Sequence, residues 1–123
     1  MSYVYIVIGA VVGAPLRYFL QGKVQNLTTA TFPYGTMVVN VTGCLVIGML
    51  LTLAEDRELL SREARLLLVT GFLGSYTTFS SFGWETFALL RENEIFQASG
   101  NVIVSIVAGL LAVWLGSAIA RLA

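Results

Sequence analysis

The residues best suited to chemistry in this sequence lie in one polar stretch, residues 71–84, inside an otherwise apolar segment. Eight of its fourteen residues are Gly, Ser or Thr. Such residues weaken a helix, because Gly loses the most backbone entropy and hydroxyl side chains compete for backbone hydrogen bonds. Non-helical backbone at membrane depth persists only where it is buried in protein or lines a water-filled cavity. The stretch therefore predicts a broken helix and an ion site.

Two kinds of ion ligand are available in this stretch. An unwound helix exposes backbone carbonyls that can coordinate a hard cation such as Na⁺, and two copies of the chain around a twofold axis would double their number. Phe79 and Phe82 are three residues apart, share one face and alternate with hydroxyl side chains. A Phe ring has a positive edge, which can solvate a small anion weakly enough for the anion to leave again. The alternative is that both rings only pack against apolar neighbours.

Polar side chains in the other apolar segments are further candidates. Thr36 and Asn40 are four residues apart and share a helix face. The Asn40 amide either bonds to a neighbouring helix or donates to an anion in a pathway. Asn101, Ser105 and Gly109 form a second narrow stripe at the same spacing, and the same two interpretations apply to it.

Two charged residues stand at the edges of apolar segments. Glu85 follows the polar stretch. An acid in or near the membrane predicts a functional role by default, and the alternative is a solvated carboxylate at the interface. Arg17 lies near the end of the first apolar segment, where it could extend to the lipid headgroups or attract anions to a vestibule. We expect a mixture of the two roles for Arg17.

Composition identifies the elements that must position these residues. Only 11% of the 123 residues are charged, against about 25% in a typical soluble domain, and the hydrophobic share is 57%. A spanning helix needs ~20 mostly apolar residues. Four uncharged runs approach or exceed that length, at 1–16, 24–54, 66–84 and 95–120. The sequence predicts an all-α membrane protein, one domain over 1–123, with transmembrane helices at about 2–22, 33–54, 64–90 (broken mid-membrane) and 96–122.

The residue inventory excludes several function classes. Cys44 is the only cysteine and there is no histidine, so most metal sites and nucleophile–base pairs lack their residues. We therefore expect that the protein is not an enzyme, and that Cys44 is a small buried apolar residue. Nothing basic precedes residues 3–12 and no small-residue cleavage site follows them, so a cleaved leader is not expected either.

Loop charges leave the membrane orientation open. In a four-span chain, both termini and the central loop share one side, which here carries four Arg against three Lys or Arg on the other side. If Arg17 lies too deep to count, four charges against two give one orientation. If it counts, the near balance favours dual topology, in which copies inserted both ways pair as an antiparallel homodimer. Gly9 and Gly13, spaced as GxxxG, favour close helix packing.

Three ordered motifs resemble the Fluc (CrcB-type) fluoride channel family across essentially the whole chain: residues 9–18, 32–43 and 71–82, of which the third is the most specific. The resemblance implies an antiparallel, dual-topology homodimer in the bacterial plasma (inner) membrane, with two fluoride pathways. Passive fluoride efflux would then give resistance to fluoride toxicity. A structural Na⁺ at the dimer centre would be held by backbone carbonyls of Gly74 and Thr77 from each chain, and the helix break would run from Gly74 through Thr77.

The same resemblance implies a fluoride pathway built from ring edges, an amide and hydroxyls. The matching residues are Phe79, Phe82, Asn40, Ser80, Ser81, Thr36 and Ser105, with Arg17 and Glu85 in vestibule or accessory roles. The sequence departs from the family at Ser75, often a second Gly, at Ser81, often Thr, and at Gly109, which can be Ser. The expected partners are a second copy, the lipid bilayer and fluoride, with no nucleic acid.

Two other function classes compete with a channel. A small dual-topology multidrug or cation exporter needs a membrane-embedded acid, typically in the first helix, and residues 1–16 contain no Asp or Glu. A purely structural subunit would not need the polar stretch at 71–84, because packing alone does not require eight Gly, Ser or Thr residues in fourteen.

Overall fold

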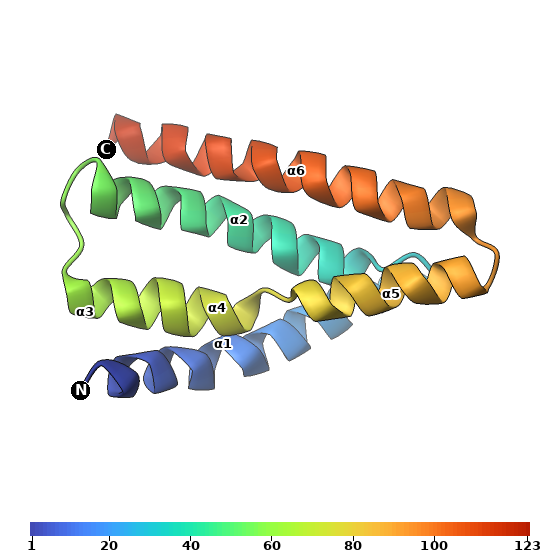
Figure 1. Ribbon diagram of the computed structural model, residues 1–123, viewed down its shortest axis with the longest axis horizontal. Coiled ribbons are helices and arrows are strands. Elements are labelled where there is room, and N and C mark those ends of the chain that lie inside the picture. The colour runs from blue at the N-terminus through green and yellow to red at the C-terminus, as the bar shows by residue number, and fades with distance from the viewer.

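In the computed structural model, which covers residues 1–123, every regular element is a helix (Figure 1). The first two elements are α1 (Ser2–Gln25) and α2 (Tyr34–Glu55), and the last is α6 (Ile95–Leu122). Between α2 and α6 lies a third segment, which is divided into α3 (Arg62–Arg65), the π-helix η1 (Leu66–Leu73), α4 (Gly74–Tyr76) and α5 (Phe79–Arg91). The all-α prediction is confirmed, and the helix boundaries agree with the expected ones to within a few residues.

Length and composition make three of these helices capable of crossing a membrane, namely α1, α2 and α6. Each contains a window of high hydropathy, and most residues of these windows are not buried in the isolated chain. The third segment differs because no single helix in it reaches a spanning length. Its pieces still follow one another in a column alongside the other three helices (Figure 1).

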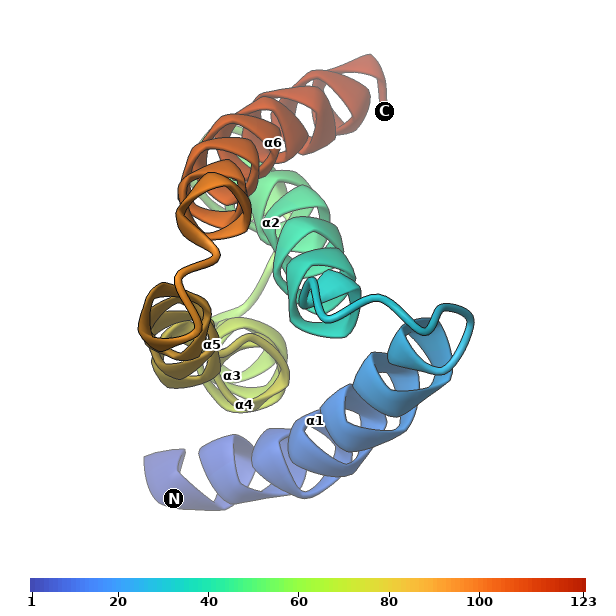
Figure 2. The same ribbon diagram turned by 90° about the vertical axis from the view of Figure 1, so that its right-hand side faces the viewer.

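The four columns run antiparallel to their chain neighbours. Both termini and the α2–α3 connection lie at one end of the molecule, and the other two connections lie at the opposite end (Figure 1). Viewed along the columns, α6, α2 and α1 follow an arc, with α3, α4 and α5 on its inner side (Figure 2). The third segment therefore has neighbours from three helices, and α1 packs mainly against η1, whereas α2 packs mainly against α6.

Backbone contact between columns is possible because the crossing points carry glycine. Gly48 of α2 and Gly116 of α6 are buried. A Cβ at either position would overlap a backbone carbonyl oxygen of the other helix, that of Val113 or of Leu45. Small residues at such positions let helix backbones approach closely in a membrane, where van der Waals contact drives association. The close helix packing predicted at Gly9 and Gly13 is confirmed as well, because a Cβ at either position would overlap backbone atoms of η1.

The break in the third segment is narrower than the sequence predicts. Gly74 is helical (φ −60°, ψ −32°) and no glycine has a positive φ. Only Thr77 (φ −86°, ψ 159°) and Thr78 (φ −149°, ψ 112°) are extended. The expectation that the break runs from Gly74 through Thr77 is therefore wrong at both ends.

The two threonines are suited to this geometry by their hydroxyls. The Thr77 hydroxyl donates to the Leu73 carbonyl at 3.0 Å and completes the turn that ends there. The Thr78 hydroxyl accepts from the Ser81 amide at 3.2 Å, as the N-cap of α5. A Thr N-cap satisfies an amide at the start of a helix that would otherwise lack a partner. The Thr77 hydroxyl thus bonds to the last turn before the break, and the Thr78 hydroxyl caps the first turn of α5.

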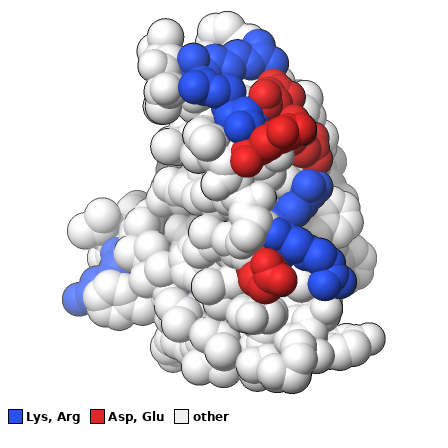
Figure 3. Space-filling model, turned by 90° about the vertical axis from the view of Figure 1, so that its left-hand side faces the viewer, with Lys and Arg blue, Asp and Glu red and all other residues white.

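The end that carries both termini is rich in paired charges (Figure 3). The Arg65–Glu55 ion pair measures 2.8 Å and the Arg121–Asp56 pair 3.4 Å, with all four side chains largely exposed. Exposed pairs of this kind contribute about 0–1 kcal/mol each. They therefore join α2 to its neighbours without dominating the stability.

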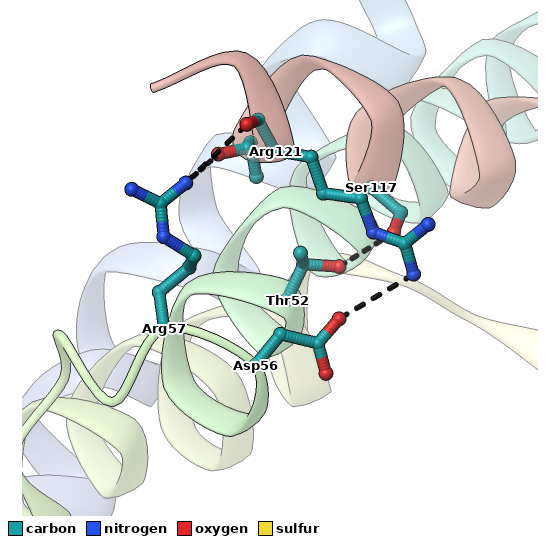
Figure 4. A network of polar contacts seen from close by, with 6 residues as sticks. Thr52, Asp56, Arg57, Ser117 and Arg121 are labelled. Atoms are coloured by element: carbon teal, nitrogen blue, oxygen red, sulfur yellow. Dashed lines mark hydrogen bonds and ion pairs between the residues drawn. The ribbon is translucent and has the colours of Figure 1, made fainter.

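Uncharged and charge-assisted contacts add to these pairs where α6 ends. Thr52 and Ser117 form a hydroxyl pair at 2.7 Å between α2 and α6. The Arg57 guanidinium donates to the carbonyls of Ala120 at 3.4 Å and Arg121 at 3.3 Å (Figure 4). Cations are favourable at a helix C-terminus, where carbonyls lack intrahelical partners. The end of α6 is thereby joined to the end of α2.

Replacing Gly116 with Ala should lower the free energy of unfolding in detergent by about 1–3 kcal/mol, because the new methyl group must displace the Leu45 carbonyl. The measurement is denaturant unfolding followed by circular dichroism. Gly100→Ala in the same helix is the matched control, since a Cβ there meets no atom within 4 Å. Equal stability of the two variants would show that the α2–α6 contact is not close enough to exclude a methyl group.

Candidate functional site

A groove of about 370 Å³ opens beside the break in the third segment. Its walls come from α2, α6 and the broken third segment, and α1 does not reach it. Its polar or small lining residues are Asn40, Gly43, Cys44, Gly74, Thr77, Thr78 and Ser105, with the rings of Phe79 and Phe82. The groove thus gathers several of the residues that the sequence singled out from three separate segments.

Asn40 closes the hydrogen bonds that the break leaves open. In a continuous helix the Thr78 amide would donate to the carbonyl of Gly74, four residues earlier. Here it donates to Asn40 Oδ1 at 2.8 Å, while Asn40 Nδ2 donates to the Thr78 carbonyl at 3.0 Å. One amide side chain therefore satisfies both backbone groups of an extended residue, which apolar surroundings would otherwise make costly. Asn40 forms this interhelical bond and lines the groove at the same time.

The same rearrangement releases backbone carbonyls beside the groove. The Gly74 carbonyl has lost the Thr78 amide as its donor, because that amide is bonded to Asn40. No hydrogen bond is made to the carbonyl of Thr77. Gly74 and Thr77 both line the groove. Carbonyl oxygens without donors are the ligands that unwound helices offer to hard cations.

The two phenylalanines lie next to each other at the start of α5. Their ring centroids are 5.7 Å apart and the ring planes are inclined by 43°. Phe82 is half-buried, whereas Phe79 is 83% exposed and has little of this chain packed against it. The chain therefore covers the Phe82 ring in part and leaves the Phe79 ring uncovered.

The candidate hydroxyls divide into two groups. Ser105 lines the groove from α6, and its hydroxyl donates to Asn101 Oδ1 at 3.3 Å. Ser80 and Ser81 are in the first turn of α5 and do not line the groove. Ser81 Oγ accepts from the Thr78 hydroxyl at 3.1 Å, and Ser80 is exposed. Only Ser105 among the predicted hydroxyls therefore faces the same space as the two rings.

Thr36 lies away from the groove, in contact with the predicted accessory acid. It is 2% exposed, and its hydroxyl donates to Glu85 Oε2 and accepts from Gln21 Nε2, both at 2.9 Å. Glu85 Oε1 is buried without a hydrogen-bond partner. Sequence reasoning missed Gln21, although it follows Arg17 by one helical turn and so shares its face.

Gln21 and Glu85 border a second and wider cavity of about 810 Å³ at the end opposite the termini. Its charged lining residues are Arg17, Lys23, Glu85 and Glu92. Arg17 also donates from Nε to the carbonyl of Ser75 at 3.1 Å, where α4 ends. The structure thus joins Arg17 and Glu85 in one polar vestibule, and Arg17 is tied to the polar stretch as well.

Cys44 and Gly109 lie opposite each other on α2 and α6. Cys44 is half-buried and lines the groove. A Cβ at Gly109 would meet the Cys44 sulfur at 3.4 Å, so a larger residue would press on the thiol. Cys44 is thus a small apolar wall of the groove, and it is less buried than the sequence analysis expects.

Comparison with known proteins gives a consistent result. The sequence model of the family described as "CrcB-like protein, Camphor Resistance (CrcB)" matches residues 4–117. A "Fluoride-specific ion channel FluC" of Solibacter usitatus is 46% identical over 121 residues, covering 98% of this chain and 99% of the relative. Proteins with the same name are 42% identical in Nitratidesulfovibrio vulgaris (98% and 97% covered) and 46% identical in Chloroflexus aurantiacus (94% and 92% covered). The resemblance expected from the three motifs is confirmed.

Replacing Asn40 with Ala should destabilise the protein by about 1–3 kcal/mol, because the amide and carbonyl of Thr78 lose their partners in an apolar setting. Hydrogen exchange at the Thr78 amide should accelerate in the same variant. The control is Ser80→Ala, which removes an exposed hydroxyl from the adjoining turn. Unchanged exchange at Thr78 in the Asn40 variant would mean that the break holds its geometry without the two Asn40–Thr78 hydrogen bonds.

Proposed function

Because the chain belongs to the CrcB-like protein family, we propose that it is a fluoride-selective ion channel. The observation that carries the proposal is the groove beside the helix break, which combines an amide, a hydroxyl and two adjacent aromatic rings. The relatives named as fluoride-specific channels are similar to this chain over nearly its whole length. The alternative of a small multidrug or cation exporter is not favoured, since α1 contains no acidic residue.

The chemistry of the groove suits a small, strongly hydrated anion. Such an ion gives up water only where donors and positive edges replace it, and conduction requires that each contact remain weak enough to release it. The ring edges of Phe79 and Phe82 would supply weak contacts, and Ser105 a hydroxyl. Asn40 keeps a second amide hydrogen beyond the one that it donates to Thr78. Beyond the groove, the path would continue along the hydroxyls of Ser80, Ser81 and Thr36.

The vestibule has the charges to deliver an anion to that path. Arg17 and Lys23 line a wide opening at one end of the chain, with Glu85 and Thr36 at its side. Basic side chains in a cleft raise the local anion concentration. Glu85 and Arg17 are accessory residues in this proposal.

The proposal includes a structural Na⁺ held by the backbone carbonyls of Gly74 and Thr77. Its support is that the break deprives these two carbonyls of helical donors and leaves them beside the groove. A cation there would lower the cost of an anion in a low-dielectric interior. Two carbonyls are too few to coordinate Na⁺, so a second chain must complete the site.

That second chain is an antiparallel copy in the proposal, with the broken segment as the fourth span and the bacterial inner membrane as the location. Two features support it. The exposed Phe79 ring and the exposed Gly74 leave the groove open on one side of a single chain. The Lys and Arg residues are nearly balanced between the two ends, so that neither orientation is favoured. Flux through such a dimer would be passive, and it would lower internal fluoride and give resistance to fluoride toxicity.

Purified protein in liposomes should release fluoride rapidly and chloride slowly, measured with ion-selective electrodes after the membrane potential is collapsed. Phe79→Ile and Phe82→Ile should each lower fluoride efflux, because an aliphatic side chain has no positive ring edge. Phe96→Ile is the matched control, since Phe96 is 91% exposed at the start of α6 and lines neither cavity. Equal efflux of the two halides, or normal fluoride efflux in both ring variants, would contradict the proposal.

Tags placed after Ala123 should be accessible from both faces of the membrane in intact cells and in inside-out vesicles. The reason is that antiparallel copies place the same terminus on opposite sides. Labelling of a C-terminal cysteine with a membrane-impermeant reagent measures this, in a Cys44→Ala background that removes the native thiol. Labelling from one face alone would rule out dual topology while leaving the fluoride channel itself open to the efflux test.

A further inference from the structure

Apolar packing fixes α5 only weakly. Leu89 is the one buried residue among its thirteen, although the helix carries four exposed large apolar side chains: Phe79, Trp84, Phe87 and Leu90. In a bilayer, lipid tails cover such side chains as well as protein does, so burial supplies little preference for one rotation of a helix. The orientation of α5 about its own axis must therefore depend on its polar contacts.

Three polar contacts tie α5 and its N-cap to other helices. Asn40 bonds to Thr78 at the start of the helix, and Thr36 bonds to Glu85 midway along it. Both belong to the groove and the vestibule described above. The third contact, from Asn101 of α6, lies outside both cavities.

Asn101 is the most deeply buried polar side chain in the protein, with 1% of its surface exposed. Its Nδ2 donates to the Thr86 hydroxyl at 2.9 Å, and that hydroxyl donates in turn to the carbonyl of Phe82 at 2.8 Å. Its Oδ1 accepts from the Ser105 hydroxyl at 3.3 Å. One amide therefore connects, through the Thr86 hydroxyl, the backbone of Phe82 to Ser105, a groove residue of α5 to one of α6.

We propose that Asn101 and Thr86 are positioning residues, which set the rotation of α5 and thereby direct Phe79 and Phe82 into the groove. Neither residue lines the groove or the vestibule. The Thr86 hydroxyl is suited to this role because its single proton is committed to Phe82 and its lone pair to Asn101. The inference rests on the proposed channel function for its effect on ion flux, and on the structure alone for its effect on α5.

Thr86→Val removes the hydroxyl and keeps the shape of the side chain. Fluoride efflux per reconstituted channel should fall roughly fivefold, the fold-change that corresponds to one interhelical hydrogen bond of about 1 kcal/mol. Discrimination against chloride should fall with it. Thr86→Ser keeps the hydroxyl and should restore wild-type efflux.

Thr52→Val is the matched control for a purely structural role. It removes a buried hydroxyl pair of similar length, 2.7 Å to Ser117, between α2 and α6 and away from α5. It should lower the melting temperature and leave fluoride efflux per channel unchanged. A loss of efflux in Thr52→Val equal to that in Thr86→Val would overturn the inference, because any lost interhelical bond would then suffice.

A spectroscopic measurement tests the placement of α5 without ion flux. In a Trp114→Phe background, Trp84 is the only tryptophan, and it lies on α5 with its ring 5.8 Å from that of Phe87 and 5.4 Å from the Arg91 guanidinium. Thr86→Val should shift its emission and its quenching by brominated lipids, whereas Thr86→Ser and Thr52→Val should not. Wild-type emission in Thr86→Val would show that packing alone places the helix.

A double variant keeps the inference testable if Thr86→Val does not fold, since that change leaves a buried amide without its acceptor. Asn101→Leu combined with Thr86→Val replaces both partners with apolar groups. A folded dimer with shifted Trp84 emission and low fluoride efflux supports the inference, and wild-type emission with wild-type efflux overturns it. Absence of fluoride efflux in the wild-type protein would contradict the channel function, and Trp84 emission would still decide the role of Asn101 and Thr86.

Discussion

The structure depends on one constraint, which is that backbone N–H and C=O groups in an apolar setting must find partners when a helix is interrupted. Thr77 and Thr78 leave the helical conformation, and the polar groups of Thr78 are satisfied by Asn40 rather than by water. The carbonyls of Gly74 and Thr77 are left without hydrogen-bond donors. The hydrogen bonds of Asn40 to Thr78 and the carbonyls without donors are therefore two results of a single break.

Contacts from helix α2 hold that break in place. Within little more than one turn, Thr42 bonds to the hydroxyl of Tyr76 at 2.8 Å, and Asn40 bonds to Thr78. Directly after Thr42, Gly43 lies so close to the Thr77 methyl group that a Cβ would overlap it. Because α2 is in turn held against α6 through glycine contacts, the position of the break follows from the packing of these two unbroken helices.

Helix α5 begins at the break and serves both cavities. Phe79 and Phe82 face the groove, and Glu85, three residues later, faces the vestibule. Its ties to α2 and α6 are hydrogen bonds from buried or half-buried side chains, and its apolar face is left to other surroundings. Polar contacts thus do in this helix what apolar cores do in soluble proteins, since a bilayer removes most of the preference for burying apolar surface.

The sequence by itself determined the helical class, the four apolar segments, the place of the interruption to within a few residues and the candidate pair of rings. Each of these depends on local composition and spacing, which a single segment carries. The tertiary structure alone decided that two threonines and not the glycines form the break, because Asn40 of α2 bonds to both backbone groups of Thr78 and Gly43 packs against Thr77. It also decided that Thr36 pairs with Glu85, that Arg17 bonds to Ser75 and that Asn101 connects to Thr86. Those partners lie on different helices, so they are fixed by how the helices pack and not by any spacing along the chain.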